Sequence, residues 1–116
     1  RVTASVLRDL AWISYLHEIK TPAADWFEIA VIHHTDCGSG LLADEQLRHG
    51  FAARGYDETE LAQLPVLDPT QTVRTDVTTL LHYPNLSTRV RVSGYAYDLA
   101  TGLLSTVVEP TTGKHA

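Results

Sequence analysis

The stretch FEIAVIHHTDCGSG, residues 27–40, decides how the rest of the chain can fold. It begins with a short, nearly continuous apolar run at 29–32 that is rich in β-branched residues. A run of this length and composition predicts a strand over 27–33 that is buried on both faces, as in a parallel sheet. The polar residues that follow, with two glycines among them, predict a loop at the carboxyl end of this strand.

Helical patterns lie on both sides of this stretch. Apolar residues at helical spacing predict a helix over 3–19, with Thr3 as its N-cap. The stripe that we expect to be buried on this helix consists of Val6, Leu10, Ile13 and His17, with Leu7 and Leu16 beside it. After the stretch, the pattern predicts helices over 43–53 and 58–63, and Gly55 would end the first of them.

The last part of the chain predicts a helix followed by a hairpin. Asp68 is a suitable N-cap and Pro69 a suitable first residue, so a helix should begin there. Apolar and polar residues alternate over 89–98, which predicts a strand, and 103–108 should pair back onto it after a turn. No regular structure is expected after Pro110.

Helices interleaved with strands indicate an α/β fold, with a mostly parallel sheet flanked by helices and a C-terminal antiparallel hairpin. The length predicts a single domain over 1–116. Three strands are few for such a sheet, and the apolar strand at 27–33 should have neighbours on both sides. We therefore expect the fold to be incomplete in this chain, which also contains no methionine.

Composition excludes several classes of protein. The net charge is −5 and the basic residues are scattered, which argues against a nucleic-acid partner. No apolar run approaches the roughly 20 residues that a membrane span needs, and the first residues show no secretion signal. Cys37 is the only cysteine, so no internal disulfide can form and a reducing, cytoplasmic location is expected.

The spacing His34-x-x-Cys37 at the carboxyl end of a buried strand is the main chemical signal. Open α/β sheets bind ligands at the carboxyl ends of their strands. Imidazole nitrogen and thiolate sulfur are preferred zinc ligands, and a short loop can direct both at one ion. Asp36 lies between them and could accept a hydrogen bond from a ligand, while Gly38 would let the backbone turn tightly.

Other interpretations of these residues remain open on spacing alone. Cys37 could be a small buried core residue, and His34 could simply be hydrogen-bonded. Cys37 could also be a thiolate nucleophile, with His33 or His34 as its base. No serine nucleophile elbow, P-loop or dinucleotide-binding glycine motif occurs in the sequence.

The remaining polar and aromatic residues are expected to have modest roles. Arg74 and Asp76 could pair, on a helix side that should be solvated or face another subunit. Core or interface packing is expected of four aromatic residues, Trp12, Tyr15, Trp26 and Phe51. The histidines expected to be bystanders are His17, His49, His82 and His115.

Residues 32–38, Ile-His-His-Thr-Asp-Cys-Gly, closely resemble the second zinc-ligand motif of β-class carbonic anhydrases. Further segments are similar to that family and follow its order. Residues 1–10 resemble the helix start after its first glycine-rich loop, and 73–77 its helix before the late strand. Residues 92–104 resemble its terminal hairpin. The resemblance implies that 1–116 is the C-terminal portion of a β-carbonic-anhydrase-like domain.

The resemblance also implies a cofactor and a reaction. In this family, two cysteines and one histidine hold zinc, which lowers the pKa of water to about 7 and so makes hydroxide available to attack carbon dioxide. His34 and Cys37 would be two of those three ligands. The function implied is the reversible hydration of carbon dioxide to bicarbonate by a homodimer or higher homo-oligomer, with no nucleic-acid or membrane partner.

One departure from the family limits what this chain can do. The family's other ligand lies in a Cys-x-Asp-x-Arg motif, which is absent from 1–116, so no catalytic residue is identified here. We expect that motif before Arg1 in a longer parent protein, and expect the chain alone to be inactive. The alternatives are a truncated, non-catalytic binding or assembly module, and an enzyme for a related small molecule such as carbon disulfide.

Overall fold

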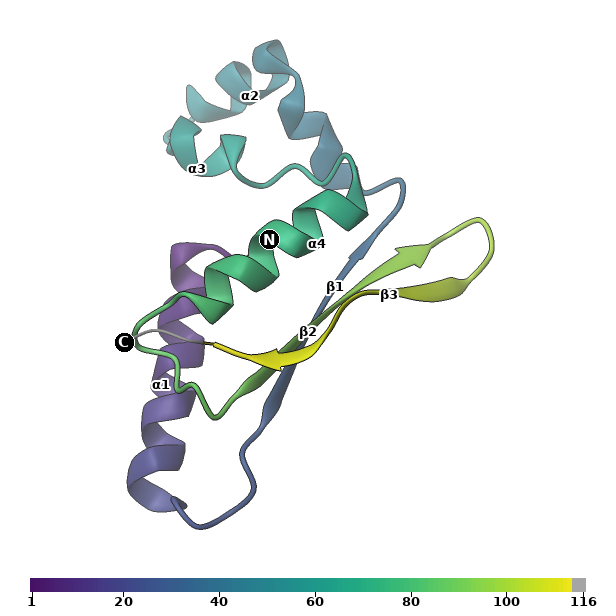
Figure 1. The fold of residues 1–116 in the computed structure, drawn as a ribbon. Helices are drawn as coiled ribbons and strands as arrows, with labels where there is room; N and C mark the ends of the chain where they lie inside the picture. Colours follow the sequence, from purple (N-terminus) through teal and green to yellow (C-terminus); the bar gives the residue numbers. More distant parts are fainter. Residues whose placement is uncertain (114–116) are drawn as a thin grey trace.

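The computed structural model describes residues 1–113 and contains a three-stranded sheet with four α-helices (Figure 1). Helix α4 lies across the sheet and contacts all three strands. The elements in chain order are α1 (Ala4–Lys20), β1 (Glu28–His34), the 3₁₀ helix η1 (Gly38–Ala43), α2 (Glu45–Ala52), α3 (Glu58–Ala62), α4 (Pro69–Leu81), β2 (Arg91–Asp98) and β3 (Leu103–Thr112).

The sheet has the order β1-β2-β3, in which β1 pairs with β2 in parallel and β2 with β3 in antiparallel orientation. The predicted α/β fold with a C-terminal hairpin is therefore confirmed. The absence of regular structure expected after Pro110 is wrong as far as Thr112, which pairs with Arg91. The β-branched Thr111 and Thr112 suit a strand, and β2 offers them a free edge to pair with.

The core lies between α4 and the sheet. Val73 and Val77 of α4 are fully buried, and they pack in one cluster with Val90, which precedes β2, and Val92 within it. Gly94 continues this contact, because a Cβ built there would lie only 2.5 Å from Cγ1 of Val73. Helix and strand thus approach more closely than any larger residue at this position would allow.

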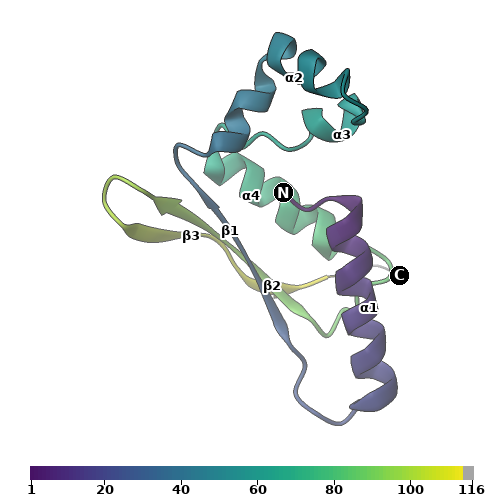
Figure 2. The ribbon, with the colours of Figure 1, turned by 180° about the vertical axis from the view of Figure 1, so that it is seen from behind.

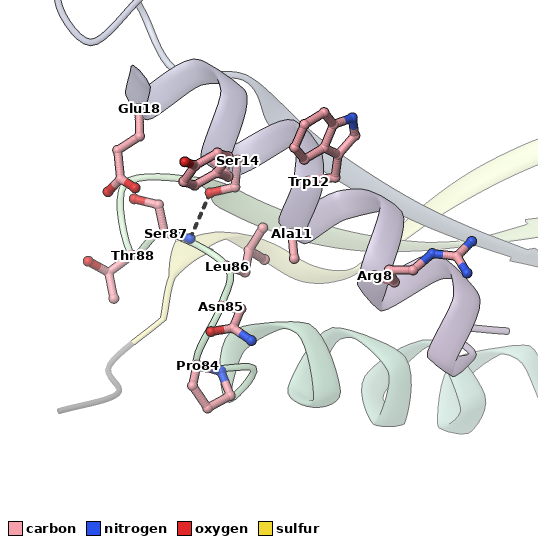
Figure 3. Close-up of a pocket in the computed structure, with 11 residues that line it drawn as sticks. Arg8, Ala11, Trp12, Ser14, Glu18, Pro84, Asn85, Leu86, Ser87 and Thr88 are labelled. Carbon is pink, nitrogen blue, oxygen red and sulfur yellow. Dashed lines mark hydrogen bonds between the residues drawn. The ribbon is translucent and has the colours of Figure 1, made fainter. Parts of the chain in front are cut away.

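Helix α1 presents to the core a face that only partly matches the predicted stripe, since Leu10 belongs to both. Val6 and Ile13 are exposed, whereas Leu7 and Leu10 pack against the core. Ser14 is buried, and its hydroxyl oxygen accepts a hydrogen bond from the backbone N–H of Ser87 at 3.0 Å (Figure 3). The buried residues 7, 10 and 14 follow the same helical spacing as the predicted stripe. Periodicity alone therefore did not show which of these two sets faces the core.

Helices α2 and α3 form a small cluster with η1 at the carboxyl end of β1 (Figure 2). The single helix predicted over 43–53 is wrong in its first residues, because Asp44 is extended and caps α2. Its carboxylate accepts hydrogen bonds from the backbone N–H groups of Gln46 and Leu47. Gly55 has a φ of +103°, as expected for a residue that ends a helix.

Strand β1 is not buried on both faces in the part of the chain that the structure describes. Its exposure alternates, and Ile32 is 54% exposed on the face away from α4. The prediction from its apolar run is therefore wrong for residues 1–113. Within the same residues, no helix combines the length and apolar character needed to cross a bilayer.

Candidate metal centre

The loop after β1 is attached to the end of β2. The backbone N–H of Thr35 donates to the carbonyl of Tyr97 at 3.0 Å, and the Thr35 hydroxyl oxygen accepts from the N–H of Leu99 at 3.0 Å. Asp36 then takes a left-handed conformation, with a φ of +51°. This turn brings the chain from His34, the last residue of β1, to Cys37, the residue before η1.

His34 has the hydrogen bonding of a metal ligand. Its Nδ1 lies 2.7 Å from the carbonyl oxygen of Thr35. A carbonyl can only accept, so Nδ1 carries the proton and Nε2 keeps a lone pair. Ligating histidines in metalloproteins commonly donate their other ring N–H to a backbone carbonyl in this way. The half-buried imidazole is therefore held in the tautomer that can bind a metal through Nε2.

Cys37 is half-buried and lies beside Ser39. Its Sγ is 3.0 Å from the Ser39 hydroxyl oxygen. Hydrogen bonds from the side chain and then from the backbone of Ser39 lower the pKa of the Cys37 thiol. Thiolate is the form of cysteine that binds metals and reacts as a nucleophile. The surroundings of Cys37 therefore favour the chemically competent form.

The two donors suit zinc, but they do not complete a site. An imidazole with a free Nε2 and a thiol with favoured ionisation are the donor chemistry of zinc. Within residues 1–113, no group of three His, Cys, Asp or Glu side chains could hold a metal ion. His34 and Cys37 therefore fit zinc as part of a larger ligand set.

Asp36 and Gly38, the two other loop residues that the sequence singled out, differ in their backbone conformation. Asp36 is exposed and makes no hydrogen bond or ion pair within the described residues 1–113. Asp36 also has the left-handed backbone conformation of this turn, whereas the tight turn was expected at Gly38. Gly38 has no left-handed φ, and a Cβ there would meet nothing within 4 Å, so open space surrounds it on that side.

A buried polar network beside the loop was missed in the sequence. His33 is 6% exposed, and its Nε2 lies 3.0 Å from Oδ2 of Asp76. Asp76 is 2% exposed, and it also accepts from Nε of Arg1 and the backbone N–H of Val2. The expected pair with Arg74 on a solvated helix side is therefore wrong. The helical spacing of 73, 76, 77 and 80, which places Asp76 on the buried face of α4, was the available signal.

His33 is neutral in this network. Burial lowers the pKa of His33, and the nearby carboxylate of Asp76 only partly opposes this effect. Nε2–H then donates to Asp76, and Nδ1 lies 2.7 Å from the Thr72 hydroxyl oxygen. Both ring nitrogens are thus occupied, and His34 donates to a carbonyl. Neither histidine has the hydrogen bond to Cys37 that a nucleophile and its base would share.

The other singled-out residues lie outside this centre. Trp12 is 58% exposed, and with Tyr15 it lines an open groove of about 700 Å³ between α1 and 84–88, so neither is a core residue (Figure 3). Phe51 is also exposed and stacks on Tyr56. The remaining predicted bystanders have local partners: His17 stacks on Trp26, His49 pairs with Glu58, and His82 donates to the Thr78 carbonyl. His115 lies outside the described residues.

Two solved carbonic anhydrases resemble this structure. The enzyme from Streptococcus mutans matches with a TM-score of 0.62 and 33% sequence identity, over 92% of this chain and 61% of its own. The enzyme from Glaciozyma antarctica matches with a TM-score of 0.59 and 26% identity, over 90% of this chain and 61% of its own. This chain therefore spans less than two thirds of either relative. No protein-family model and no curated protein matches the sequence. The shared structure and the identity of up to 33% show that the chain has a carbonic-anhydrase-like fold.

Proposed function

We propose that the protein containing this chain is a β-class carbonic anhydrase, which hydrates carbon dioxide reversibly to bicarbonate with zinc. The chain would form the C-terminal portion of its domain. The observation that carries this proposal is the pairing of two donors on one loop of a carbonic-anhydrase-like fold. These are His34, whose Nε2 is free, and Cys37, whose ionisation is favoured.

The residues of this chain would hold the metal and fix its surroundings. Nε2 of His34 and Sγ of Cys37 would be two protein ligands, and the third would come from outside residues 1–113. When bound, zinc supplies Lewis-acid chemistry that lowers the pKa of water to about 7. The Thr35 carbonyl orients the His34 ring, and the attachment of Thr35 to β2 holds the loop in place.

Association and location are part of the same proposal. We expect a homodimer or higher homo-oligomer, which the exposed apolar side chains of Ile32 on β1 and Trp12 on α1 support. The unpaired edge of β1 among the described strands also favours contact with further protein. A cytoplasmic location would keep the thiol of Cys37 reduced. Light scattering after gel filtration of the full-length protein would test the oligomeric state.

A second candidate is a non-catalytic binding or assembly module. The absence of three possible ligands within residues 1–113 favours it, because two ligands do not close a tetrahedral site. The coding sequence upstream of Arg1 separates the two candidates. A Cys-x-Asp-x-Arg motif there supports the enzyme, and its absence supports the module.

The decisive experiment measures zinc and activity together in the full-length protein. We expect about one zinc per chain and rapid hydration of carbon dioxide, both lost in His34→Ala and Cys37→Ser. His82→Ala is the matched control, since its Nδ1 donates to the Thr78 carbonyl in α4, and it should retain both. A folded protein with far less than one zinc per chain and no hydration would contradict the proposal. Hydrolysis of carbon disulfide in a parallel assay would instead indicate an enzyme that acts on this related small molecule.

A further inference from the structure

Ser39 connects Cys37 to the segment that precedes α4. The backbone N–H of Val66 donates to the Ser39 hydroxyl oxygen at 3.1 Å. Cys37 Sγ lies 3.0 Å from the same oxygen. A serine hydroxyl has one hydrogen to donate. The Ser39 oxygen already accepts a hydrogen bond from the Val66 N–H. The hydroxyl hydrogen therefore remains to be donated to the sulfur, which sets the direction of the contact.

The donor that orients Ser39 is itself held firmly. Val66 is 8% exposed, so its N–H has little access to water as an alternative partner. The η1 helix is in close contact with this segment, because a Cβ built on Gly40 would lie 3.2 Å from Cδ2 of Leu67 and 3.5 Å from the Val66 carbonyl oxygen. The loop and the segment are thus closely packed at Gly40, the residue after Ser39.

The peptide unit that contains the Val66 N–H is bound on its other side as well. Its carbonyl, that of Pro65, accepts from Nη1 of Arg1 at 3.1 Å. The same guanidinium contacts the buried carboxylate of Asp76 through Nε at 3.0 Å. A charged donor on the carbonyl polarises the peptide and strengthens its N–H as a donor. A continuous polar chain therefore runs from Asp76 to Ser39.

We propose that Ser39 is a positioning residue for the Cys37 sulfur, donating its hydroxyl hydrogen to the sulfur and so fixing its place and its donor strength toward a metal. This inference rests on the proposed function, in which Cys37 is a zinc ligand. Hydrogen bonds to a ligand from its surroundings orient it and tune the metal that it binds. The lowered pKa of the Cys37 thiol has the same cause.

Cobalt(II) substitution of the full-length protein tests the inference, since the sulfur-to-cobalt charge-transfer band reports the donor strength of the sulfur. In Ser39→Ala the band should move to lower energy, and the affinity for the metal should fall about tenfold. Ser39→Thr keeps the hydroxyl and should restore both. Ser105→Ala, on the exposed surface of β3, is the control and should match the wild type.

A metal-free measurement separates this inference from the proposed function. Alkylation of Cys37 by iodoacetamide, followed by peptide mass spectrometry, should slow about two- to tenfold in Ser39→Ala and recover in Ser39→Thr. An unchanged alkylation rate, or an unchanged charge-transfer band, would overturn the role of Ser39. If the wild type takes up no metal, the proposed function fails; a slower alkylation of Ser39→Ala would then still support the contact.

Discussion

Nε2 of His33 lies 3.0 Å from Oδ2 of Asp76, and both side chains are almost completely buried. This contact joins the end of β1 to the middle of α4, and Arg1 closes the network from the N-terminal side. The Asp76 carboxylate accepts hydrogen bonds from Arg1, Val2 and His33. Each of these donors would lose its partner if the carboxylate were removed. The loop with His34 and Cys37 follows this contact directly, so its position depends on the network.

Removing the carboxylate should destabilise the protein strongly. Asp76→Ala leaves Arg1 and His33 without their common partner, and we expect a loss of about 3–5 kcal/mol in the free energy of unfolding. Asp76→Asn keeps one acceptor and should lose less. Urea denaturation of the full-length protein measures both. Asp9→Ala removes only an exposed pair with Arg8 and should change stability by less than about 0.5 kcal/mol. Equal effects of Asp76→Ala and Asp9→Ala would contradict the network.

Stability should fall as the pH is lowered below the ordinary histidine range. Burial lowers the pKa of His33 in the folded protein, so the unfolded chain binds a proton at a higher pH than the folded one. The contribution of neutral His33 is complete above about pH 6.5 and declines as the pH falls toward the folded-state pKa. Unfolding free energies at several pH values should therefore show a slope below pH 6.5 that is reduced in His33→Gln. His49→Gln, at an exposed site, should keep the slope.

Gly94 should tolerate no larger residue. In Gly94→Ala, the new Cβ would lie 2.5 Å from Val73 and 3.0 Å from Val77, so α4 must move away from the sheet. We expect a loss of about 1–3 kcal/mol in the free energy of unfolding. Gly50→Ala, within α2, meets nothing within 4 Å and should be neutral or stabilising by about 0.5–1 kcal/mol. Thermal unfolding should show a lower melting temperature for Gly94→Ala and an unchanged or higher one for Gly50→Ala. An unchanged melting temperature in Gly94→Ala would refute the close approach of α4 and β2.

Metal removal should destabilise the full-length protein through His34 and Cys37. A ligand present at 100 times its dissociation constant stabilises the folded state by about 3 kcal/mol. A chelator should therefore lower the melting temperature of the wild type and have no effect on Cys37→Ser. His82→Ala should respond as the wild type does. A chelator effect that persists in Cys37→Ser would place the metal elsewhere.

Local features of the fold were predictable where residues act on their immediate neighbours. Asp68 and Pro69 mark the start of α4, and Gly55 has a positive φ in the turn that follows α2. His34 and Cys37 could be proposed as zinc ligands because their spacing lies within one loop, and this assignment stays a prediction. The resemblance to carbonic anhydrases, first seen in the residues, is matched by the similarity of structure.

Other features depend on contacts between residues far apart in the sequence. Asp76 is buried because Arg1, His33 and the backbone of Val2 meet it there, and no local pattern contains these partners. The same reason applies to α1, where the N–H of Ser87 selects Ser14 for the buried face. The extension of β3 likewise depends on the register of its pairing with β2.

The parallel pairing of β1 with β2 determines the order in which the loop can be completed during synthesis. Glu28 pairs with Arg91, so the chain between them must be made before the two strands can meet. The loop at Thr35 is attached to Tyr97 and Leu99, which leave the ribosome later still. Contacts so distant in sequence form slowly. His34 and Cys37 therefore emerge early, but the loop that carries them can reach its final geometry only after Tyr97 and Leu99 have been synthesised.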